Sequence, residues 1–545
     1  MDRRTFIKTG AAAVAVGAAA RAGATASRPN LVLIMADDMG FSDLGCYGSE
    51  IATPNLDRLA AGGSRMTQFY NCARCCPTRA SLLTGLYPHQ AGVGHMAGPA
   101  FDQGAAGYQG HLAANTATIA ETLRTAGYRT LMAGKWHVGQ GRGQMPVDRG
   151  FDRYLGILVG AANYWKPKLY SGNQPIDNPP DCYTTDVFTD AALGFMKESR
   201  ADRKPYFLYL AFNAPHWPLH ARPEDIEKYM GRYDGGWDRL RNERHERQKA
   251  LGLVDPKWPL SPRDPAAADW ASLSTDQKKR MSKKMAVYAA MVDRLDQNVG
   301  RVVQELEASG ELDNTLVVFL SDNGACHESG PFGFDAQPQY MVNASTAYAD
   351  IGTAKSFCSY GRSWSNAGNT PFRLHKSWTH EGGISSPLVA HWPNRLSARR
   401  VSGPGHVIDL MPTLLEAAGA APLSERDGKP VQMIEGRSLL PQLTGGEAPE
   451  RSLGWEHEGN RAWRQGDLKL VSTFDQGNKW ELYNVVEDRT EKNNLAAKAP
   501  EKVSEMAKSW EAWGRRVGVE PWKKSQGVVP WVKEFLDPRG GGGRD

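Results

Sequence analysis

The sequence predicts an α/β fold with a large, mostly parallel sheet that is covered by helices on both faces. Short, continuous apolar runs have the length and composition of buried strands: residues 30–35, 128–133, 206–212, 315–320 and 388–392. Helical patterns lie between them, notably at 276–309 and 407–418. Buried strands that alternate with helices favour a parallel sheet, because each helix carries the chain back to the same edge.

The composition is that of a globular protein. The chain has 545 residues, of which 41% are hydrophobic and 23% charged, so disorder as the main state is excluded. A mean hydropathy of −0.50 argues against a protein with several membrane spans. Lys and Arg number 65 and Asp and Glu 60, and this net charge of +5 is not gathered into the stripe that nucleic-acid binding requires.

Residues 1–26 have the pattern of an export signal. Adjacent arginines, Arg3 and Arg4, precede an apolar run over 10–20, and Ala24-Thr25-Ala26 forms a cleavage site. The arginine pair resembles a twin-arginine signal, which predicts a periplasmic or secreted product beginning near Ser27. The apolar run is too short to span a bilayer, so we expect no stable membrane span. This segment carries four basic and one acidic side chain, so the remaining chain has a net charge of only +2.

The pattern divides the remaining chain at about residue 450. We expect a catalytic domain over 27–450 and a smaller α+β subdomain over 451–545, because a strand-turn-strand pattern at 462–472 precedes an amphipathic helix at 501–517. A disordered tail is expected from about residue 540. The charge-rich stretch at 224–253 is predicted to be a helical, solvated face or insertion.

Functional side chains follow several of the predicted strands. These side chains stand in four short segments: Asp37-Asp38, Gly134-Lys135-Trp136-His137, Asn213-Ala214-Pro215-His216 and Ser321-Asp322-Asn323-Gly324. Each residue alone is most often a cap or turn residue, but the carboxyl ends of parallel strands gather sites. Three carboxylates and an amide are hard oxygen ligands, which suit Ca²⁺ or Mg²⁺.

The most specific motif is Cys75-Cys76-Pro77-Thr78-Arg79-Ala80-Ser81-Leu82-Leu83-Thr84-Gly85. It resembles the signature of the sulfatases, an alkaline-phosphatase-like family whose leading cysteine is oxidised to formylglycine. The resemblance covers about residues 29–495 and includes the strand-end segments and His380-Glu381-Gly382-Gly383. Three further segments are most similar to bacterial arylsulfatases: Tyr233-Asp234-Gly235-Gly236-Trp237, Asn369-Thr370-Pro371-Phe372 and Gly382-Gly383-Ile384.

The resemblance implies a role for each matching residue. A cation would be held by Asp37, Asp38, Asp322 and Asn323, with Cys75 beside them. This ion is Ca²⁺ in most of the family, with Mg²⁺ as the alternative. The residues that would stabilise the formylglycine hydrate are Arg79 and Lys135, and those that would hold the sulfate oxygens are Lys135, His216 and Lys376. A hydroxyl of the hydrate would attack sulfur, His216 with help from Lys376 would protonate the leaving oxygen, and His137 would take the proton that lets sulfate leave.

The implied function is hydrolysis of sulfate esters, with aryl sulfates favoured over carbohydrate sulfates. The implied partners are a small-molecule sulfate ester, a formylglycine-generating or anaerobic sulfatase-maturating enzyme, and the twin-arginine export machinery. His95, in a glycine-rich loop after the motif, is a further candidate for substrate contact. One departure from the family affects the outer substrate pocket, because Ile384-Ser385-Ser386-Pro387 replaces the basic residue that often follows Glu-Gly-Gly.

Other interpretations of the same residues are weaker. Cys72-Ala73-Arg74-Cys75 has redox-motif spacing, but that use leaves residues 77–85 unexplained. Zinc is not favoured, since His216 and His220 flank Pro218 and His375 and His380 are five residues apart. A phosphomonoesterase or phosphodiesterase of the same superfamily and an inactive homologue that binds sulfated ligands are the remaining alternatives. Seven cysteines cannot all pair, and conversion of Cys75 would leave six thiols with no need to pair.

Overall fold

The computed structural model describes residues 28–336 and 344–522. An eleven-stranded sheet forms its centre, in the order β10-β2-β9-β8-β1-β7-β3-β4-β5-β6, with β11 also paired to β2. The strands are β1 (Asn30–Ala36), β2 (Ser64–Tyr70), β3 (Arg129–Lys135), β4 (Arg153–Ile157), β5 (Leu169–Ser171), β6 (Gln174–Ile176), β7 (Tyr206–Ala211), β8 (Thr315–Ser321), β9 (Ser385–His391), β10 (Arg399–Val401) and β11 (Gly405–His406).

The predicted fold class is confirmed, with antiparallel pairs toward the sheet edges. Strands β8, β1, β7, β3 and β4 run parallel to one another at the centre. Strand β9 runs antiparallel to both β8 and β2, and β5 and β6 form antiparallel pairs beside β4. The parallel centre brings the carboxyl ends of β1, β3, β7 and β8 to one edge of the sheet, where the candidate site lies.

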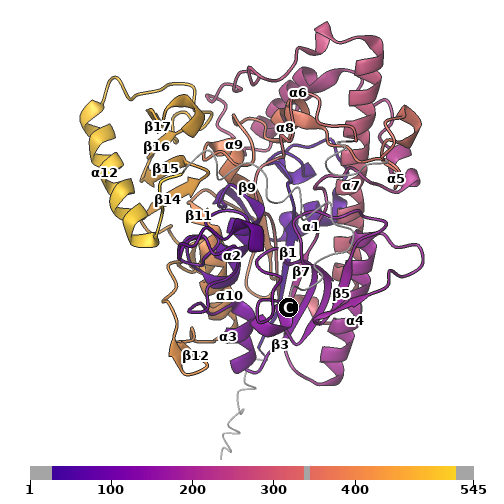
Figure 1. The fold of residues 1–545 in the computed structure, drawn as a ribbon, viewed down its shortest axis with the longest axis vertical. Coiled ribbons are helices and arrows are strands. Elements are labelled where there is room, and N and C mark those ends of the chain that lie inside the picture. Colours follow the sequence, from indigo (N-terminus) through magenta and orange to yellow (C-terminus); the bar gives the residue numbers. More distant parts are fainter. Residues whose placement is uncertain (1–27, 337–343, 523–545) are drawn as a thin grey trace, which may run out of the picture.

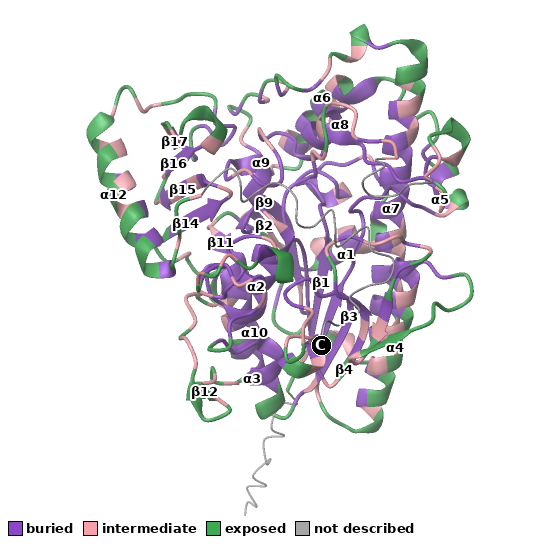
Figure 2. Ribbon diagram, in the orientation of Figure 1, coloured by how far each residue is buried: buried purple, intermediate pink, exposed green. Residues whose placement is uncertain are grey.

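Helices cover both faces of this sheet (Figure 1). The helices are α1 (Pro54–Gly62), α2 (Cys75–Thr84), α3 (Ile119–Thr125), α4 (Thr184–Ala201), α5 (Pro223–Glu227), α6 (Gly236–Ala250), α7 (Thr275–Ala308), α8 (Gly361–Gly368), α9 (Glu381–Ile384), α10 (Leu410–Ala418), α11 (Leu440–Leu443) and α12 (Pro500–Val517). Alternate residues of β1 point to opposite faces: Val32 and Ile34 pack with α1, α4 and α7, and Leu31 and Leu33 pack with α2, α3 and α10. The central strands are therefore buried on both sides (Figure 2).

A separate antiparallel sheet follows the main body in the sequence. Its strands β14 (Ser452–His457), β15 (Asn460–Gln465), β16 (Leu468–Ser472) and β17 (Trp480–Asn484) lie between α12 and the main body (Figure 1). Lys469 of this sheet bonds Glu381 of α9 and Glu491, each at 2.9 Å, and Arg489 bonds Glu381 at 2.7 Å. These four side chains are fully or almost fully buried, so the ion pairs fix the small sheet to the chain beside the candidate site. A two-stranded hairpin, β12 (Glu425–Arg426) and β13 (Lys429–Pro430), completes the strands.

The terminal predictions fall outside the described residues. The predicted signal over 1–26 and the predicted tail from about residue 540 both lie there. Within the described part of the chain, no helix is long and apolar enough to cross a membrane.

The prediction of a solvated face over 224–253 describes only one side of α6, because the other side of the helix is buried. Leu240, Arg244 and Gln248 are four residues apart, so they share one helix face, and that face is buried. Arg244 is inaccessible to solvent and bonds Asp43 at 2.5 Å and Glu50 at 2.9 Å. Arg244, one of the charges that indicated a solvated helix, instead forms a buried ion-pair cluster with the loops that follow β1.

We expect Arg244→Met to lower the free energy of unfolding by about 3–5 kcal/mol, because it leaves Asp43 buried without its cation and Glu50 with only the Arg247 cation, at 3.4 Å. Arg239→Met, on the same helix, is the matched control: Arg239 pairs with Glu243 at the surface, and its loss should cost at most about 1 kcal/mol. Urea unfolding of both variants measures the difference. Equal stabilities for the two variants would contradict the assignment of Arg244 as a buried structural cation.

Candidate active site

Two neighbouring strands deliver four oxygen-bearing side chains to one point. Strand β1 pairs in parallel with β8 so that Ala36 lies opposite Ser321. The residues that follow, Asp37 and Asp38 after β1 and Asp322 and Asn323 after β8, therefore meet at the sheet edge, and all are at most 1% exposed. Asn323 donates a hydrogen bond from Nδ2 to Asp38 Oδ1 at 2.7 Å, and the Asp38 backbone N–H donates to Asp322 Oδ1 at 3.1 Å.

Each buried carboxylate has a cationic partner. Arg79 bonds Asp322 Oδ2 through Nη2 at 2.8 Å and Nε at 3.2 Å. Lys376 Nζ donates to Asp38 Oδ2 at 2.9 Å, and Lys135 Nζ donates to Asp37 Oδ2. Three acids and three bases, drawn from five separate segments, thus form one buried cluster of alternating charge.

The cluster shifts the carboxylate pKa values in opposite directions. Burial, together with the neighbouring Asp322 carboxylate, raises the pKa of Asp37 well above its usual value. Burial also opposes ionisation of Asp38, but the Lys376 ammonium holds the pKa of Asp38 below its usual value. Additional positive charge near Asp37 would therefore be stabilising.

Cys75 is the first residue of α2, a helix whose ten residues are all buried. Pro77 is tolerated in the first turn, where the backbone N–H has no helical acceptor, and Gly85 ends the helix with φ +67°. Arg79 lies one turn after Cys75 on the same helix face, so the spacing of the motif places Cys75 and the arginine side by side.

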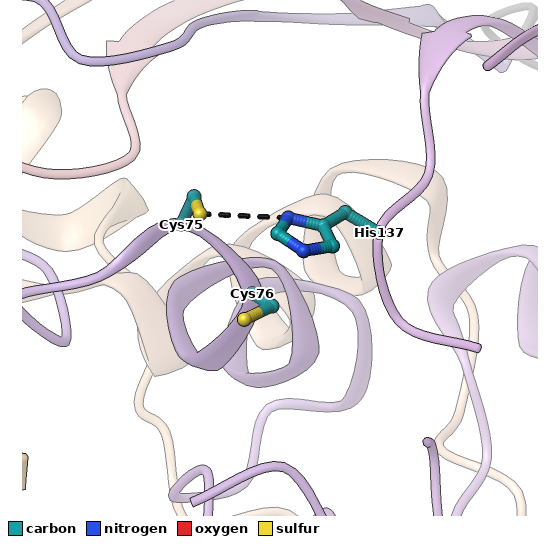
Figure 3. Close-up of side chains that lie close together, drawn as sticks. All are labelled: Cys75, Cys76 and His137. Carbon is teal, nitrogen blue, oxygen red and sulfur yellow. Dashed lines mark hydrogen bonds between the residues drawn. The ribbon is translucent and has the colours of Figure 1, made fainter. Parts of the chain in front are cut away.

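His137 faces the Cys75 side chain. Its Nδ1 lies 3.4 Å from Cys75 Sγ (Figure 3). A hydrogen bond from Cys76, with the charge of Lys135, holds the pKa of the Cys75 thiol well below its usual value. Burial lowers the pKa of His137 to about 4, so its imidazole is neutral near pH 7 and can accept a proton.

His216 lies on the other side of the cluster, beside Lys376. Its Nδ1 is 2.7 Å from the Trp217 carbonyl oxygen, which only accepts, so Nδ1 carries the proton. Its Nε2 lies 3.3 Å from both Lys376 Nζ and Asp38 Oδ2. Burial lowers the pKa of His216 to about 4, so the neutral ring accepts a hydrogen bond from the Lys376 ammonium.

The oxygen cluster fits a hard divalent cation. Within residues 28–336 and 344–522, no hydrogen-bond donor reaches Asp37 Oδ1 or Asn323 Oδ1, although both atoms are buried. Such oxygens are costly to bury without a partner, and a cation bound by carboxylate and amide oxygens would satisfy them. Asp37 and Asp38 also belong to a set of potential ligand atoms, with His216, that lie within 4.8 Å of one another.

A cavity of about 500 Å³ opens above Cys75. His137, His216 and Lys376 lie in its floor, and much of its wall is apolar: Met96, Ala97, Phe101, Leu158, Val159, Ala161, Ala162 and Trp217. Arg74 and Glu328, which form an ion pair at 3.0 Å, also line it. The sequence did not single out Glu328, although it lies only a few residues beyond Asn323 in the same strand-end loop.

His95 is placed differently from the other predicted site residues. His95 is not among the described residues that line the cavity above Cys75. Its ring packs instead against Phe101, His457 and Trp522, with ring centres 5.7, 5.8 and 4.7 Å away. The predicted substrate contact of His95 therefore has no support in the geometry of the cavity.

The cysteines do not favour the redox interpretation. All seven lie in the described ranges, buried and as free thiols. Cys72 Sγ donates to Ser81 Oγ at 3.3 Å and does not pair with Cys75.

Comparison with known proteins agrees with this site. Residues 29–420 match the family model described as Sulfatase. The chain is 36% identical over 531 residues to an uncharacterised sulfatase of Schizosaccharomyces pombe, covering 91% of this chain and 95% of the relative. It is 35% identical over 426 residues to an arylsulfatase of Klebsiella aerogenes, covering 76% and 91%. The crystal structure of Ps i-CgsB in complex with k-i-k-neocarrahexaose matches with a TM-score of 0.67 and 25% identity, covering 94% of this chain and all of that chain.

The fold and the charged site define a hydrolase of sulfuric esters. The chain belongs to the sulfatase family, since the match covers more than half of its length. Sulfatases generally use a formylglycine and a divalent metal ion, and the Cys75 position and the oxygen cluster are suited to both.

We expect added Ca²⁺ to raise the melting temperature of chelator-treated protein and to restore its activity. Asp37→Asn removes one charged ligand and should weaken Ca²⁺ binding by about tenfold or more. Asp296→Asn is the control, because Asp296 is a buried carboxylate that bonds Asn55 and Leu56 at the start of α1 and does not belong to the oxygen cluster. Titration calorimetry checks this, and equal Ca²⁺ affinity in wild type and Asp37→Asn would contradict the assigned site.

Proposed function

We propose that this sulfatase hydrolyses aryl sulfate esters through a formylglycine formed from Cys75. The apolar cavity directly above Cys75 carries the proposal. A sulfate group held by the charged floor would place its ester-linked group against Phe101, Leu158 and Trp217, surfaces that favour a flat apolar ring over a polyhydroxylated sugar. The arylsulfatase relative supports the same substrate class.

The charged residues of the floor would bind the sulfate. Lys376 and His216 line the cavity together with Cys75, and the charge of Lys135 acts on the Cys75 thiol. These three groups would hold the sulfate oxygens, and Arg79 with Lys135 would stabilise the charged form of the nucleophile. Because these groups are buried and held in place by carboxylates, they require little reorganisation when negative charge develops.

Two histidine positions divide the proton transfers. Formylglycine, when present, supplies a hydrated aldehyde with two hydroxyl groups. One hydroxyl attacks sulfur; when the other loses its proton, the aldehyde re-forms and sulfate leaves, so no water has to cleave the intermediate. His137 Nδ1 faces the Cys75 side chain and would take the proton from that second hydroxyl. The Lys376–His216 pair would protonate the leaving oxygen. The Lys376 ammonium would be the donor, because the only proton of the neutral His216 ring is on Nδ1, which donates it to the Trp217 carbonyl oxygen.

We assign the cation as Ca²⁺, with Mg²⁺ as the alternative. Asp37, Asp38, Asp322 and Asn323 would hold it beside Cys75, and their oxygens are the donor type that Ca²⁺ prefers. The bound ion would supply positive charge against a sulfate oxygen.

Three further proposals concern export, the division into domains and the enzyme that modifies Cys75. Residues 1–26 would direct twin-arginine export to the periplasm or the medium, and residues 27–450 and 451–545 would form the catalytic domain and its C-terminal subdomain. Oxidation of Cys75 requires a formylglycine-generating or an anaerobic sulfatase-maturating enzyme as a partner.

We expect mass spectrometry of the active enzyme from a converting host to find formylglycine at Cys75. Cys75→Ala should lower the rate of sulfate release by about 1,000-fold or more, because it removes the nucleophile. Cys46→Ala, which truncates another buried thiol, is the control and should keep wild-type activity. An unmodified Cys75 thiol in fully active enzyme would contradict the mechanism.

We expect turnover of an aryl sulfate to exceed turnover of the matching aryl phosphate and of a sulfated monosaccharide. Val159→Asn should raise KM for the aryl sulfate severalfold, because it places an amide on the apolar wall of the cavity. Ile176→Asn is the matched control, since Ile176 on β6 has the same 38% exposure but does not line the cavity. Preference for the phosphate would refute the reaction class, and preference for the sugar would refute the aryl assignment.

A further inference from the structure

Three potential metal ligands meet between the main body and the C-terminal sheet, apart from the oxygen cluster. They are His95 in the loop after α2, His457 at the end of β14, and Glu458 in the turn that follows. Glu458 Oε1 lies 3.7 Å from His95 Nδ1 and 3.6 Å from His457 Nε2, and one ligand atom of each residue lies within 4.8 Å of the others.

Both imidazoles are buried with nitrogens that have no protein hydrogen bond. His95 is 3% exposed and His457 is inaccessible to solvent. Within the described ranges, no hydrogen-bond partner reaches Nδ1 of His95 or either ring nitrogen of His457. Buried polar atoms without partners are rare in folded proteins, so these nitrogens indicate a missing ligand.

We propose that His95, His457 and Glu458 bind a zinc ion. Two imidazoles and one carboxylate are a common ligand set for Zn²⁺, whereas Ca²⁺ prefers oxygen ligands alone. Small side-chain shifts would bring the three atoms to the 2.0–2.2 Å ligand distances of zinc, because they already lie around one point. Burial lowers the pKa of His95 to about 4, so its imidazole is neutral and free to coordinate.

A cationic side chain and a cavity lie next to Glu458. Arg74 lies 4.0 Å from Glu458 Oε1, but it pairs more closely, at 3.0 Å, with Glu328. Glu458 and Trp522 line a cavity of about 380 Å³, whose lining also includes Arg74 and Arg362 but neither His95 nor His457. From this cavity a water molecule could reach an ion held at Glu458 as its fourth ligand.

The proposed ion would connect two parts of the chain close to the catalytic cysteine. His457 and Glu458 belong to the C-terminal sheet, whereas His95 belongs to the main body, and the backbone oxygen of His95 accepts a hydrogen bond from Cys76 Sγ at 3.5 Å. Zinc at this position would hold the small sheet against the loop that follows α2. The inference does not depend on the proposed substrate or on the formylglycine.

The test measures zinc in full-length protein that carries Cys75→Ala and Cys76→Ala and is saturated with Ca²⁺. These conditions remove the thiols beside His137 and fill the oxygen cluster, both of which would otherwise compete for the metal. After chelation, zinc loading and desalting, we expect about one zinc per chain and X-ray absorption that shows imidazole ligands and no sulfur. Zinc should also raise the melting temperature, because it binds only the folded chain.

His457→Gln and Glu458→Gln, made separately in this background, should each lose the bound zinc and its effect on the melting temperature. His406→Gln is the matched control, because His406 is another buried imidazole and packs against Trp455 of the same β14 strand. The control should keep the zinc. Failure of the parent protein to bind zinc, or retention of zinc by both test variants, would overturn the proposal.

Discussion

Asp37, Asp38 and Asp322 lie side by side with almost no exposure to solvent, and burial of a carboxylate is tolerable only when positive charge lies beside it. Each receives its own cation from a different part of the chain: Lys135 at the end of β3, Lys376 after α8 and Arg79 on α2. Because Arg79 is one turn beyond Cys75 on α2, its pairing with Asp322 also fixes where Cys75 lies. The need to neutralise buried charge therefore assembles the site.

Residues that follow the strands adopt backbone conformations with positive φ, and these conformations help to place the charged side chains of the site. Asp38 and His137 have φ values of +66° and +54°, a region that Asp and His enter more readily than most residues. Gly134 lets β3 approach β7, since a Cβ at this position would lie 1.9 Å from the Ala211 carbonyl oxygen. The residue types of the motifs thus serve the backbone path as well as the chemistry.

The sequence predicted what depends on local pattern and missed what depends on distant contacts. Apolar runs and strand-end motifs gave the central sheet and the meeting of Asp37 with Asp322, because parallel neighbours end at the same edge. The burial of Arg244 could not be predicted, since its partners lie in loops far along the chain. His95 was expected to contact substrate because it follows the motif, but His457 and Glu458, which surround it in the fold, belong to a different sheet.

The central claim is that one buried cluster of charge holds the cation, the nucleophile position and the sulfate-binding bases together. The most direct measurement is a crystal structure of the Ca²⁺-loaded enzyme from a converting host, with anomalous scattering to locate calcium. We predict one calcium peak among Asp37, Asp38, Asp322 and Asn323, beside an oxidised residue 75. A calcium ion elsewhere, with these four side chains still bonded only to protein groups, would contradict the account.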